Sequence, residues 1–334
     1  MAARNTINDV AREAGVSIKT VSRVLNKERY VRAETRVKVE TAMAALSFSP
    51  SLAARSLAGN RSHQIALIYD NHSPYYIHAI QDGVWARCRQ AGVRMLAQPA
   101  DVSSPTIAAE VGGLIDETHV DGIILSSPVT DCAPVLAELE RRGTPFVRIS
   151  PGTNHALTSS VYMDDVQAAD DMTTHLINLG HRIIGFIVGH PNHMASEQRL
   201  FGYRRALDRA GISFDPERVL PGEFDFASGA SAAESLLSLP RRPTAIFASN
   251  DDMAAGVLAV AHRLNLHIPD DLSVAGFDDT ALAQLVWPPL TTIRQPTRDL
   301  AFAAANLLFE RGDSVEHRRL QHELVLRAST ARVG

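Results

Sequence analysis

From Gln64 onward, short apolar runs alternate with longer amphipathic stretches. The apolar runs are Ile65–Tyr69, Gly122–Leu125, Phe146–Ile149, Ile183–Val188, Ala245–Ala248 and Leu272–Phe277. The amphipathic stretches cover residues 76–91, 106–118, 134–142, 166–179, 198–210, 229–238 and 252–265. Alternation of strand and helix predicts parallel sheets flanked by helices. Because there are more units than one sheet of ordinary size holds, we expect two doubly wound parallel-sheet subdomains.

Glycines mark the ends of several expected helices. Gly92, Gly143, Gly180 and Gly211 each follow an amphipathic stretch, and glycine tolerates the left-handed conformation that ends a helix. In folds of this kind, ligands bind beyond the carboxyl ends of the strands. A cleft between two such subdomains is therefore the expected ligand pocket.

Charge divides the chain into two parts. The 334 residues suit two or three domains, and 45% of them are hydrophobic. Residues 1–62 carry eleven Lys or Arg against five Asp or Glu, a net charge of +6, whereas the remainder has a net charge of −10. A basic head on an acidic body is typical of a nucleic-acid-binding module joined to a separate globular domain. The alternative is chance clustering.

The composition argues against several other classes. No apolar run approaches the roughly 18 residues of a membrane span, and the first residues show no signal-peptide core. The two cysteines, Cys88 and Cys132, lack metal-ligand spacing, which fits a reducing compartment. We therefore expect a cytoplasmic protein without a membrane segment, metal or cofactor.

Two short helices are predicted at the start of the chain. Thr6 and Asp9 have the spacing of a capping box, and Gly15 can end the helix that follows. Ser17 is a second N-cap, before a helix over Ile18–Asn26. Two short helices joined by a glycine-containing turn form a helix-turn-helix. The outward residues of the second helix are Ile18, Lys19, Ser22 and Arg23.

These outward side chains suit the edges of DNA bases. Lys and Arg donate to guanine O6 and N7, and Ile18 can contact a thymine methyl group. A third helix is expected at about Ala33–Leu46, with Thr35, Arg36 and Lys38 placed for phosphates. The alternative is a small helical subdomain with a solvated basic face.

Two segments of the head, Thr6–Ser17 and Thr20–Asn26, are similar to the headpiece of the lac repressor (LacI/GalR) family. Ala53–Gly59 resembles the hinge helix of that family, whose leucine wedges into a central base step of the minor groove. Leu57 stands at that position. The resemblance implies that the DNA-binding residues are Thr6, Ser17, Ile18, Lys19, Thr20, Ser22, Arg23, Asn26, Thr35, Arg36, Ala54 and Leu57. Arg32 replaces the usual serine cap of the third helix, which predicts a weaker cap.

The resemblance continues to the end of the chain. Similar motifs are Leu179–Gly185, Gly202–Leu207, Ala248–Asp251, Val274–Asp279 and Pro289–Ile293. They imply a body like the periplasmic sugar-binding proteins, with three crossings between its lobes. The expected domains are a headpiece (1–50), a hinge helix and linker (51–62) and an effector-binding and dimerisation domain (63–334). The N-subdomain covers about 63–161 and 292–320, and the C-subdomain about 162–291 and 321–334.

The resemblance also places residues at an effector site. They are His72, Tyr75, Tyr76, Ser126, Ser150, Arg199, Phe224, Asn250, Asp278 and Gln295. One of the two tyrosines is expected to pack instead, with Tyr76 the candidate. For Arg199 the alternative is an internal ion pair. Ser150 stands where several sugar-responsive members have Asp, which argues against assigning the ligand of the lac repressor itself to this chain. Arg148 lies among apolar residues and needs a partner.

The function predicted is a repressor of carbohydrate-utilisation genes that binds pseudo-palindromic double-stranded operator DNA as a homodimer. A mono- or disaccharide in the cleft would relieve repression, by binding one arrangement of the lobes better than the other. Corepression by a purine is the alternative. Because no leucine heptad follows Arg327, we expect a dimer and not a tetramer.

Two other classes of protein remain. A transport-linked sugar-binding protein would need a signal peptide and no headpiece. An enzyme could use the paired acids Asp164-Asp165, Asp251-Asp252 and Asp278-Asp279. However, no nucleophile elbow, P-loop, HExxH or GxGxxG motif is present, and adjacent Asp residues after strands are more often caps. The sequence therefore predicts a regulator without catalytic residues.

Overall fold

The computed structural model describes residues 5–25, 28, 30–48, 61–71, 73–310, 312 and 314–333. The chain forms two compact units, one up to His63 and one from Gln64, which we call the head and the body. The proposed hinge residues 51–60 lie outside the described residues.

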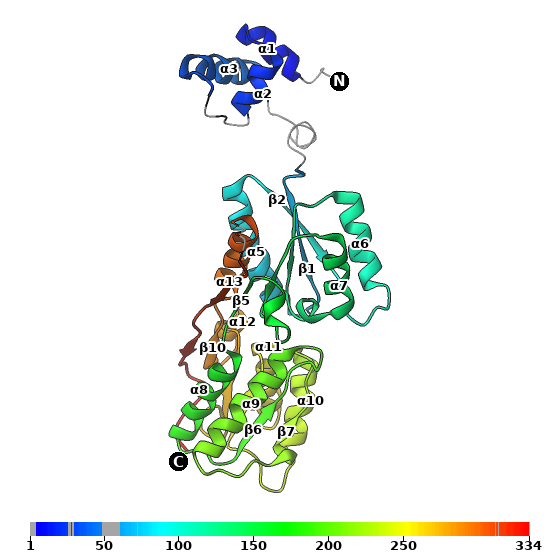
Figure 1. Ribbon diagram of the computed structural model, residues 1–334. Coiled ribbons are helices and arrows are strands. Elements are labelled where there is room, and N and C mark those ends of the chain that lie inside the picture. Colours follow the sequence, from blue (N-terminus) through cyan, green and yellow to red (C-terminus); the bar gives the residue numbers. More distant parts are fainter. Residues whose placement is uncertain are drawn as a thin grey trace. The chain divides into compact units, whose positions relative to one another are not determined.

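The described residues of the head form three helices (Figure 1), which pack around a small apolar core. They are α1 (Ile7–Ala14), α2 (Ile18–Leu25) and α3 (Ala33–Ala45). The backbone N–H of Thr6 donates to Asp9 over 2.8 Å at the start of α1, as a capping box requires. Gly15 ends α1 with a φ of 65°. Arg32 makes no side-chain cap for α3, as expected from its replacement of serine.

Val10, Val21 and Val39, one from each helix, are fully buried and hold the head together. The turn between α1 and α2 is set by Gly15 and by Ser17, whose hydroxyl accepts from the N–H of Thr20. The outer face of α2 is left exposed.

The first lobe of the body is built on a six-stranded parallel sheet. Its strands are β1 (Gln64–Tyr69), β2 (Arg94–Pro99), β3 (Ile123–Leu125), β4 (Phe146–Ile149), β5 (Ser160–Tyr162) and β11 (His317–Arg319), in the order β11-β5-β4-β3-β1-β2. Helices α5 (Pro74–Ala91) and α13 (Thr297–Phe309) pack together on one face. Helices α6 (Ile107–Thr118) and α7 (Ala133–Arg142) cover the other (Figure 1).

The second lobe has a four-stranded parallel sheet with the order β7-β6-β8-β9. The strands are β6 (Ile184–Ile187), β7 (Val219–Leu220), β8 (Ala245–Ala248) and β9 (Ser273–Ala275). Helices α8 (Asp165–Asn178) and α9 (Met194–Arg209) pack on one face. Helices α10 (Phe226–Leu237) and α11 (Asp251–Arg263) pack on the other, and α12 (Leu282–Leu285) follows β9.

The chain passes between the lobes three times, as predicted. It crosses from β5 to α8, returns through β10 (Thr292–Arg294) to α13, and crosses again from β11 to β12 (Glu323–Val325). β10 and β12 pair antiparallel, which ties two of the crossings together. The C-terminal segment then joins the second lobe, where the N–H of Val274 donates to the carbonyl of Ser329. The predicted fold class is confirmed.

Arg148, for which the sequence suggested no partner, is fully buried within β4. It donates to Asp131 over 2.7 Å and to the carbonyls of Thr130, Thr153 and Asn154 over 2.8 Å each. Arg148 therefore holds the loop that follows β4. It is a structural residue of the first lobe and not a lining residue of the ligand cavity described below.

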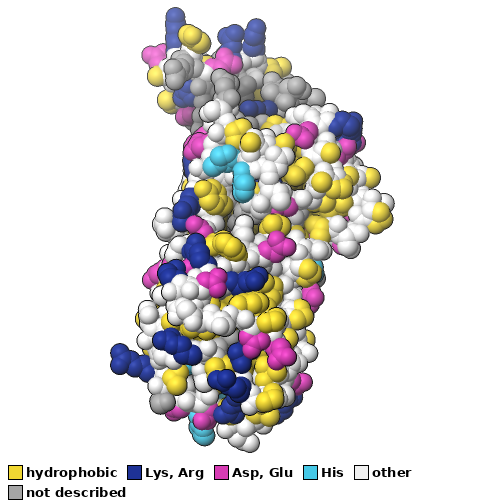
Figure 2. All heavy atoms as spheres, turned by 60° about the horizontal axis from the view of Figure 1, so that its bottom comes forward, with side chains coloured by type: hydrophobic (Ala, Val, Ile, Leu, Met, Phe, Trp, Pro, Cys, Tyr) yellow, Lys and Arg dark blue, Asp and Glu magenta, His cyan; other side chains and the backbone are white. Residues whose placement is uncertain are grey.

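Within the described ranges, none of the helices is both long and apolar enough to span a membrane. The same residues contain no group of three or more His, Cys, Asp or Glu side chains arranged to hold a metal ion. Figure 2 shows a face of the body on which basic and acidic side chains are interspersed.

Candidate ligand cavity and nucleic-acid-binding surface

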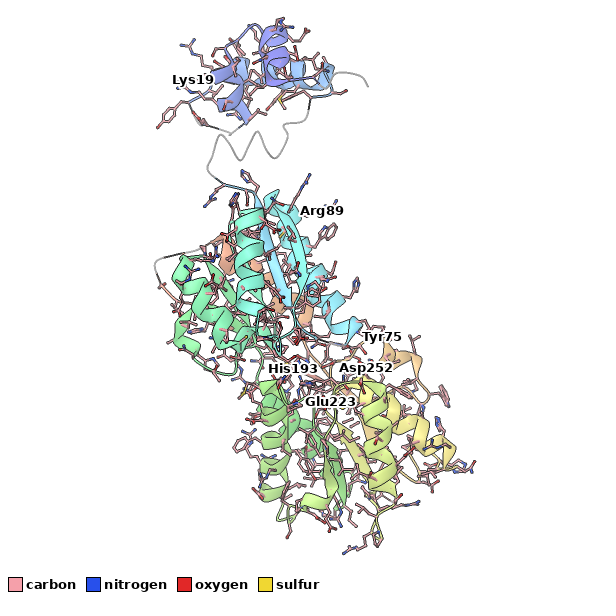
Figure 3. The ribbon with its side chains drawn as sticks, turned by 90° about the vertical axis from the view of Figure 1, so that its right-hand side faces the viewer. Lys19, Tyr75, Arg89, His193, Glu223 and Asp252 are labelled. Atoms are coloured by element: carbon pink, nitrogen blue, oxygen red, sulfur yellow. The ribbon has the colours of Figure 1, made fainter. Side chains whose placement is uncertain are left out.

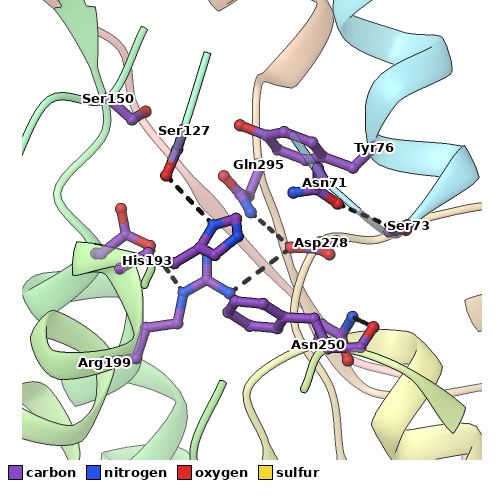
Figure 4. Close-up of a pocket in the computed structure, with 13 residues that line it drawn as sticks. Asn71, Ser73, Tyr76, Ser127, Ser150, His193, Arg199, Asn250, Asp278 and Gln295 are labelled. Carbon is purple, nitrogen blue, oxygen red and sulfur yellow. Dashed lines mark hydrogen bonds and ion pairs between the residues drawn. The ribbon is translucent and has the colours of Figure 1, made fainter. Parts of the chain in front are cut away.

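A polar cavity lies between the two lobes of the body, where the carboxyl ends of the strands of both sheets meet (Figure 4). Side chains from both lobes line it. The lining residues are Asn71, Ser73, Tyr76, Ser127, Ser150, Asp165, His193, Ala195, Arg199, Phe224, Asn250, Asp278 and Gln295.

Arg199, on α9, is the centre of an ion-pair network in this cavity. Its Nε donates to Asp165 over 2.8 Å, and its Nη1 donates to the carbonyl of Ser249. The guanidinium lies 3.6 Å from the centre of the Phe277 ring. The side chains of Arg199 and Asp165 are only 6% and 5% exposed. Arg199 is thus both an internal ion-pair partner and a lining residue.

Asp278 brings a second carboxylate into the cavity. It lies 3.9 Å from Nη1 of Arg199 and accepts from the side-chain amide of Gln295. Burial raises the pKa of Asp278 to about 7, although Arg199 and the Gln295 bond act in the opposite direction. This carboxyl can therefore change charge near neutral pH.

The aromatic side of the cavity is formed by Phe224, Tyr76 and His193. Phe224 has a φ of 60° and its carbonyl accepts from the amide of Asn250 over 2.8 Å. The Asn250 oxygen also caps α11 by accepting from the N–H of Met253. Both functional groups of this amide are thus used within the protein. Asn250 is placed to position Phe224, whose ring meets that of His193 edge-on.

The side chains of the two tyrosines of α5 leave the helix in directions about 100° apart, as those of consecutive helical residues do. Tyr76 lines the cavity, and burial, together with Asp278 and Asp165, raises the pKa of its hydroxyl. Tyr75 is 37% exposed and does not line the cavity. The expectation that Tyr76 would be the tyrosine that only packs does not fit this placement.

Two hydrogen bonds join the lobes across the cavity. Ser73 Oγ, at the start of α5, donates to Asp252 over 3.0 Å, and Ser127 Oγ lies 3.3 Å from Nδ1 of His193. Figure 3 shows His193 and Asp252 where the lobes meet. The arrangement of the lobes is therefore coupled to groups that a ligand would contact.

Most of the predicted effector residues are brought together. Those that line the cavity are Tyr76, Ser150, Arg199, Phe224, Asn250, Asp278 and Gln295. Ser126 is fully buried outside it, because successive residues of an extended segment face opposite ways and Ser127 takes the lining position. His72 lies outside the described residues. The roles of these residues in binding stay predictions.

The predicted effector set left out six lining residues: Asn71, Ser73, Ser127, Asp165, His193 and Ala195. A signal existed for three of them, because Asn71, Ser73 and Ser127 directly follow predicted strands. Asp165 was noticed only as half of an acidic pair. The structure separates that pair, since Asp164 caps α8 through the N–H of Gln167 and Asp165 binds Arg199.

In the head, the exposed face of α2 carries the predicted base-reading side chains. Ile18 is 50% exposed, and Lys19 and Arg23 are exposed on the same short helix. Arg23 lies 3.6 Å from Glu28, so its guanidinium is held loosely near the end of α2. Thr20 is half-buried and its hydroxyl lies 2.9 Å from that of Ser17.

Arg36, the predicted phosphate contact on α3, donates to the carbonyl of Glu28 over 3.2 Å and is only partly exposed. Thr35 beside it is half-buried, as is Ser22 on α2, whereas Thr6 is exposed at the cap of α1. Asn26, Ala54 and Leu57 lie outside the described residues. These DNA contacts also stay predictions.

A helix-turn-helix head joined to a two-lobed α/β body defines a class: DNA-binding transcription regulators that carry a separate small-molecule domain. Comparison with known sequences supports this class. Residues 6–51 match the profile described as bacterial regulatory proteins, lacI family. Residues 173–330 match a periplasmic binding protein-like domain.

Several characterised relatives extend over nearly the whole chain. The transcriptional repressor PurR of Vibrio campbellii is 33% identical over 98% of this chain and 99% of its own length. The ribose operon repressor of Escherichia coli is 35% identical over 95% of this chain and 96% of its own. The chain therefore belongs to the lacI family of bacterial transcription regulators, which confirms the resemblance found in the sequence.

Solved structures support the same family assignment. The lac repressor dimer bound to operator and an anti-inducer superposes with a TM-score of 0.84 at 28% identity, covering 98% of this chain and all of that one. A complex of the transcriptional regulator CelR with cellobiose gives a TM-score of 0.75 at 30% identity, with the same coverage.

Proposed function

We propose that this regulator is a repressor of carbohydrate-utilisation genes, and that a mono- or disaccharide bound in the inter-lobe cavity releases it from its operator. The observation that carries the proposal is the lining of that cavity. Carboxylate, amide and hydroxyl groups from both lobes surround the space beside the rings of Phe224 and Tyr76. Sugars present hydroxyl groups at their edge and an apolar face to aromatic rings, so this combination suits them.

The similar proteins favour a sugar as the ligand but do not indicate which sugar. One is a ribose operon repressor and one solved neighbour holds cellobiose. PurR is equally similar, and its name favours a purine as the second candidate. Three of the paired acids that an enzyme could have used serve as a cap or an ion-pair partner: Asp164 caps α8, Asp165 binds Arg199 and Asp279 binds Arg294.

We further propose that the chain works in the cytoplasm as a homodimer on a pseudo-palindromic operator. The lac repressor that superposes on it was solved as an operator-bound dimer. Residues 1–50 would form the headpiece. Residues 51–62 would form a hinge in which Leu57 reaches the minor groove, and residues 63–334 would bind the effector and dimerise.

The test is a screen of mono- and disaccharides and purines by thermal shift of the full chain, repeated as release of labelled operator. A sugar that raises the melting temperature should also release DNA. Asp278→Ala and Arg199→Ala should lose both responses and keep operator binding. Asp270→Ala, an exposed carboxylate outside the cavity, is the matched control. Release by purines alone, or full ligand affinity in both cavity variants, would contradict the proposal.

A further inference from the structure

The charges of the cavity restrict its ligand beyond what the proposed function states. We propose that the ligand carries no anionic group, so that an unphosphorylated, uncharged sugar is accepted and its phosphate or acid derivative is rejected. This inference rests on the proposed function, because it concerns the ligand of the same cavity.

The first observation is that the cation of the cavity is already neutralised. Arg199 is the only lysine or arginine among the described lining residues. Its Nε is bonded to Asp165, its Nη1 to a backbone carbonyl, and its plane lies against Phe277. Because both partners of the ion pair are nearly inaccessible to water, the solvent screens their attraction little. A ligand phosphate that reached the other N–H groups of the guanidinium would meet a positive charge that Asp165 already compensates.

The second observation is that a further carboxyl faces the same space. Asp278 lies 3.9 Å from Arg199, and its partner Gln295 is uncharged. When Asp278 is ionised, Asp165 and Asp278 together outweigh the single positive charge of Arg199. An anionic ligand would then lose its water shell beside a carboxylate without gaining a cation, which is strongly unfavourable.

Helix N-termini often bind anions, but those of α8, α11 and α5 are poorly suited to do so here. Helix α8 begins with Asp165, and α11 carries Asp251 and Asp252 in its first turn, so these positive helix ends already have carboxylates. Helix α5 begins at Pro74, which has no N–H to offer. The positive ends of α8 and α11 are therefore already occupied by carboxylates of the protein, and that of α5 lacks its first N–H donor.

Asp165→Asn is the substitution that tests this inference. The amide oxygen of Asn can still accept from Nε of Arg199, so the geometry is kept while one negative charge is removed. The variant should gain a binding site for anions. Asp82→Asn is the matched control, because Asp82 pairs with Arg298 over 2.6 Å on the exposed surface, outside the cavity.

The experiment uses the full chain at pH 6, below the pKa of about 7 of Asp278, so that the Asp278 carboxyl is mostly protonated and Arg199 is left uncompensated in Asp165→Asn. Calorimetry is run with sulfate and with inorganic phosphate on the wild type and both variants. Only Asp165→Asn should bind these ions, at least about tenfold more tightly than the wild type. Circular dichroism checks that the variant is folded. Wild-type binding of either anion as tight as that of Asp165→Asn overturns the inference.

A second arm uses matched ligands on the wild type: ribose with ribose 5-phosphate, glucose with glucose 6-phosphate, and glucose with gluconate. The uncharged member of any pair that binds should be favoured by at least about tenfold. Operator release by a phosphorylated or acidic member in preference to its neutral partner overturns the inference but leaves the proposed function standing. If no sugar, charged or neutral, affects operator binding, the proposed function fails, and the sulfate arm still decides the charge of the cavity.

Discussion

At the scale of single residues, Asp278 is a group whose charge depends strongly on the fold. Its side chain is 8% exposed. Burial raises its pKa, Arg199 and Gln295 lower it, and Asp252 and Asp165 raise it further, with a result of about 7. A hydroxyl that donates to this carboxyl binds the ionised form better than the protonated form. Ligand binding should therefore be linked to proton release.

We expect ligand affinity to rise as the pH increases from 6 to 8 and to level off above that range. The stability of the ligand-free chain has the opposite dependence. Between about pH 4 and pH 7 the folded state holds a proton that the unfolded state has lost, so the free energy of unfolding falls as the pH rises. Asp278→Asn cannot titrate, so it should lose this part of the pH dependence of ligand affinity and of the free energy of unfolding. Calorimetry of ligand binding from pH 6 to pH 8 measures the first, and an unchanged profile in the variant would refute the assignment.

The exposed side chains of α2 make a second prediction about single residues. Lys19→Ala should cost about 1–3 kcal/mol of operator affinity and relax the preference at one base pair per half-site, if the exposed Lys19 of α2 reads a base edge as we propose. Lys38→Ala, an exposed lysine of α3, should instead weaken all sequences alike. Binding to randomised half-sites distinguishes the two. Unchanged base preference in Lys19→Ala would show that α2 does not read the groove through this residue.

At the scale of elements, the packing of α8 against α9 depends on Gly202. A Cβ at this position would lie 2.2 Å from the carbonyl oxygen of Val166 and 2.9 Å from Cβ of Ala169. Gly113, in the middle of α6, has open space around it. Both residues lie within helices of the body, so replacement by alanine changes helix propensity alike at both positions. A difference between the two variants then reports on packing.

Gly202→Ala should lower the free energy of unfolding by about 1–3 kcal/mol, because the two helices must separate. Gly113→Ala should raise it by about 0.5–1 kcal/mol, because alanine loses less backbone entropy than glycine in a helix. Urea denaturation followed by circular dichroism measures both. Effects of the same sign would contradict the close approach of α8 and α9.

The elements with a clear period were predictable from the sequence, and the short ones were not. Helices such as α6 and α8 begin and end within one residue of their predicted limits. Strands β2, β5, β7, β10, β11 and β12 were missed. Five of them have only two or three residues, too few to show an alternation, and β2 is largely exposed and has no long apolar run. Helix α13 was missed although Leu300, Ala301, Ala304 and Leu308 have helical spacing, which a closer count would detect.

The cavity was only partly predictable for a different reason. Asp278 and Asn250 follow strands, so their position at the edge of a sheet could be expected. The contact of His193 with Ser127 joins residues 66 positions apart on different lobes. Such pairs depend on how two separately folded sheets meet, which no local pattern records.

At the scale of the whole molecule, one head offers too little surface for tight, specific binding. A single module makes few phosphate contacts, and specific affinity normally needs a larger interface. A symmetric dimer supplies two heads that read two half-sites related by the same twofold axis. The spacing of the half-sites is then fixed by the protein, and the affinity must depend on it.

The last prediction follows from that spacing. Light scattering should give a mass twice the 36.2 kDa of one chain. Inserting about 5 bp between the half-sites turns them to opposite faces of the duplex, since B-DNA repeats every 10–10.5 bp. The affinity should then fall to that of a single half-site, because only one head can bind. Insertion of about 10 bp returns both half-sites to the same face of the duplex, so it is the control for the added length. A monomeric mass, or equal affinity for both insertions, would mean that each head binds alone.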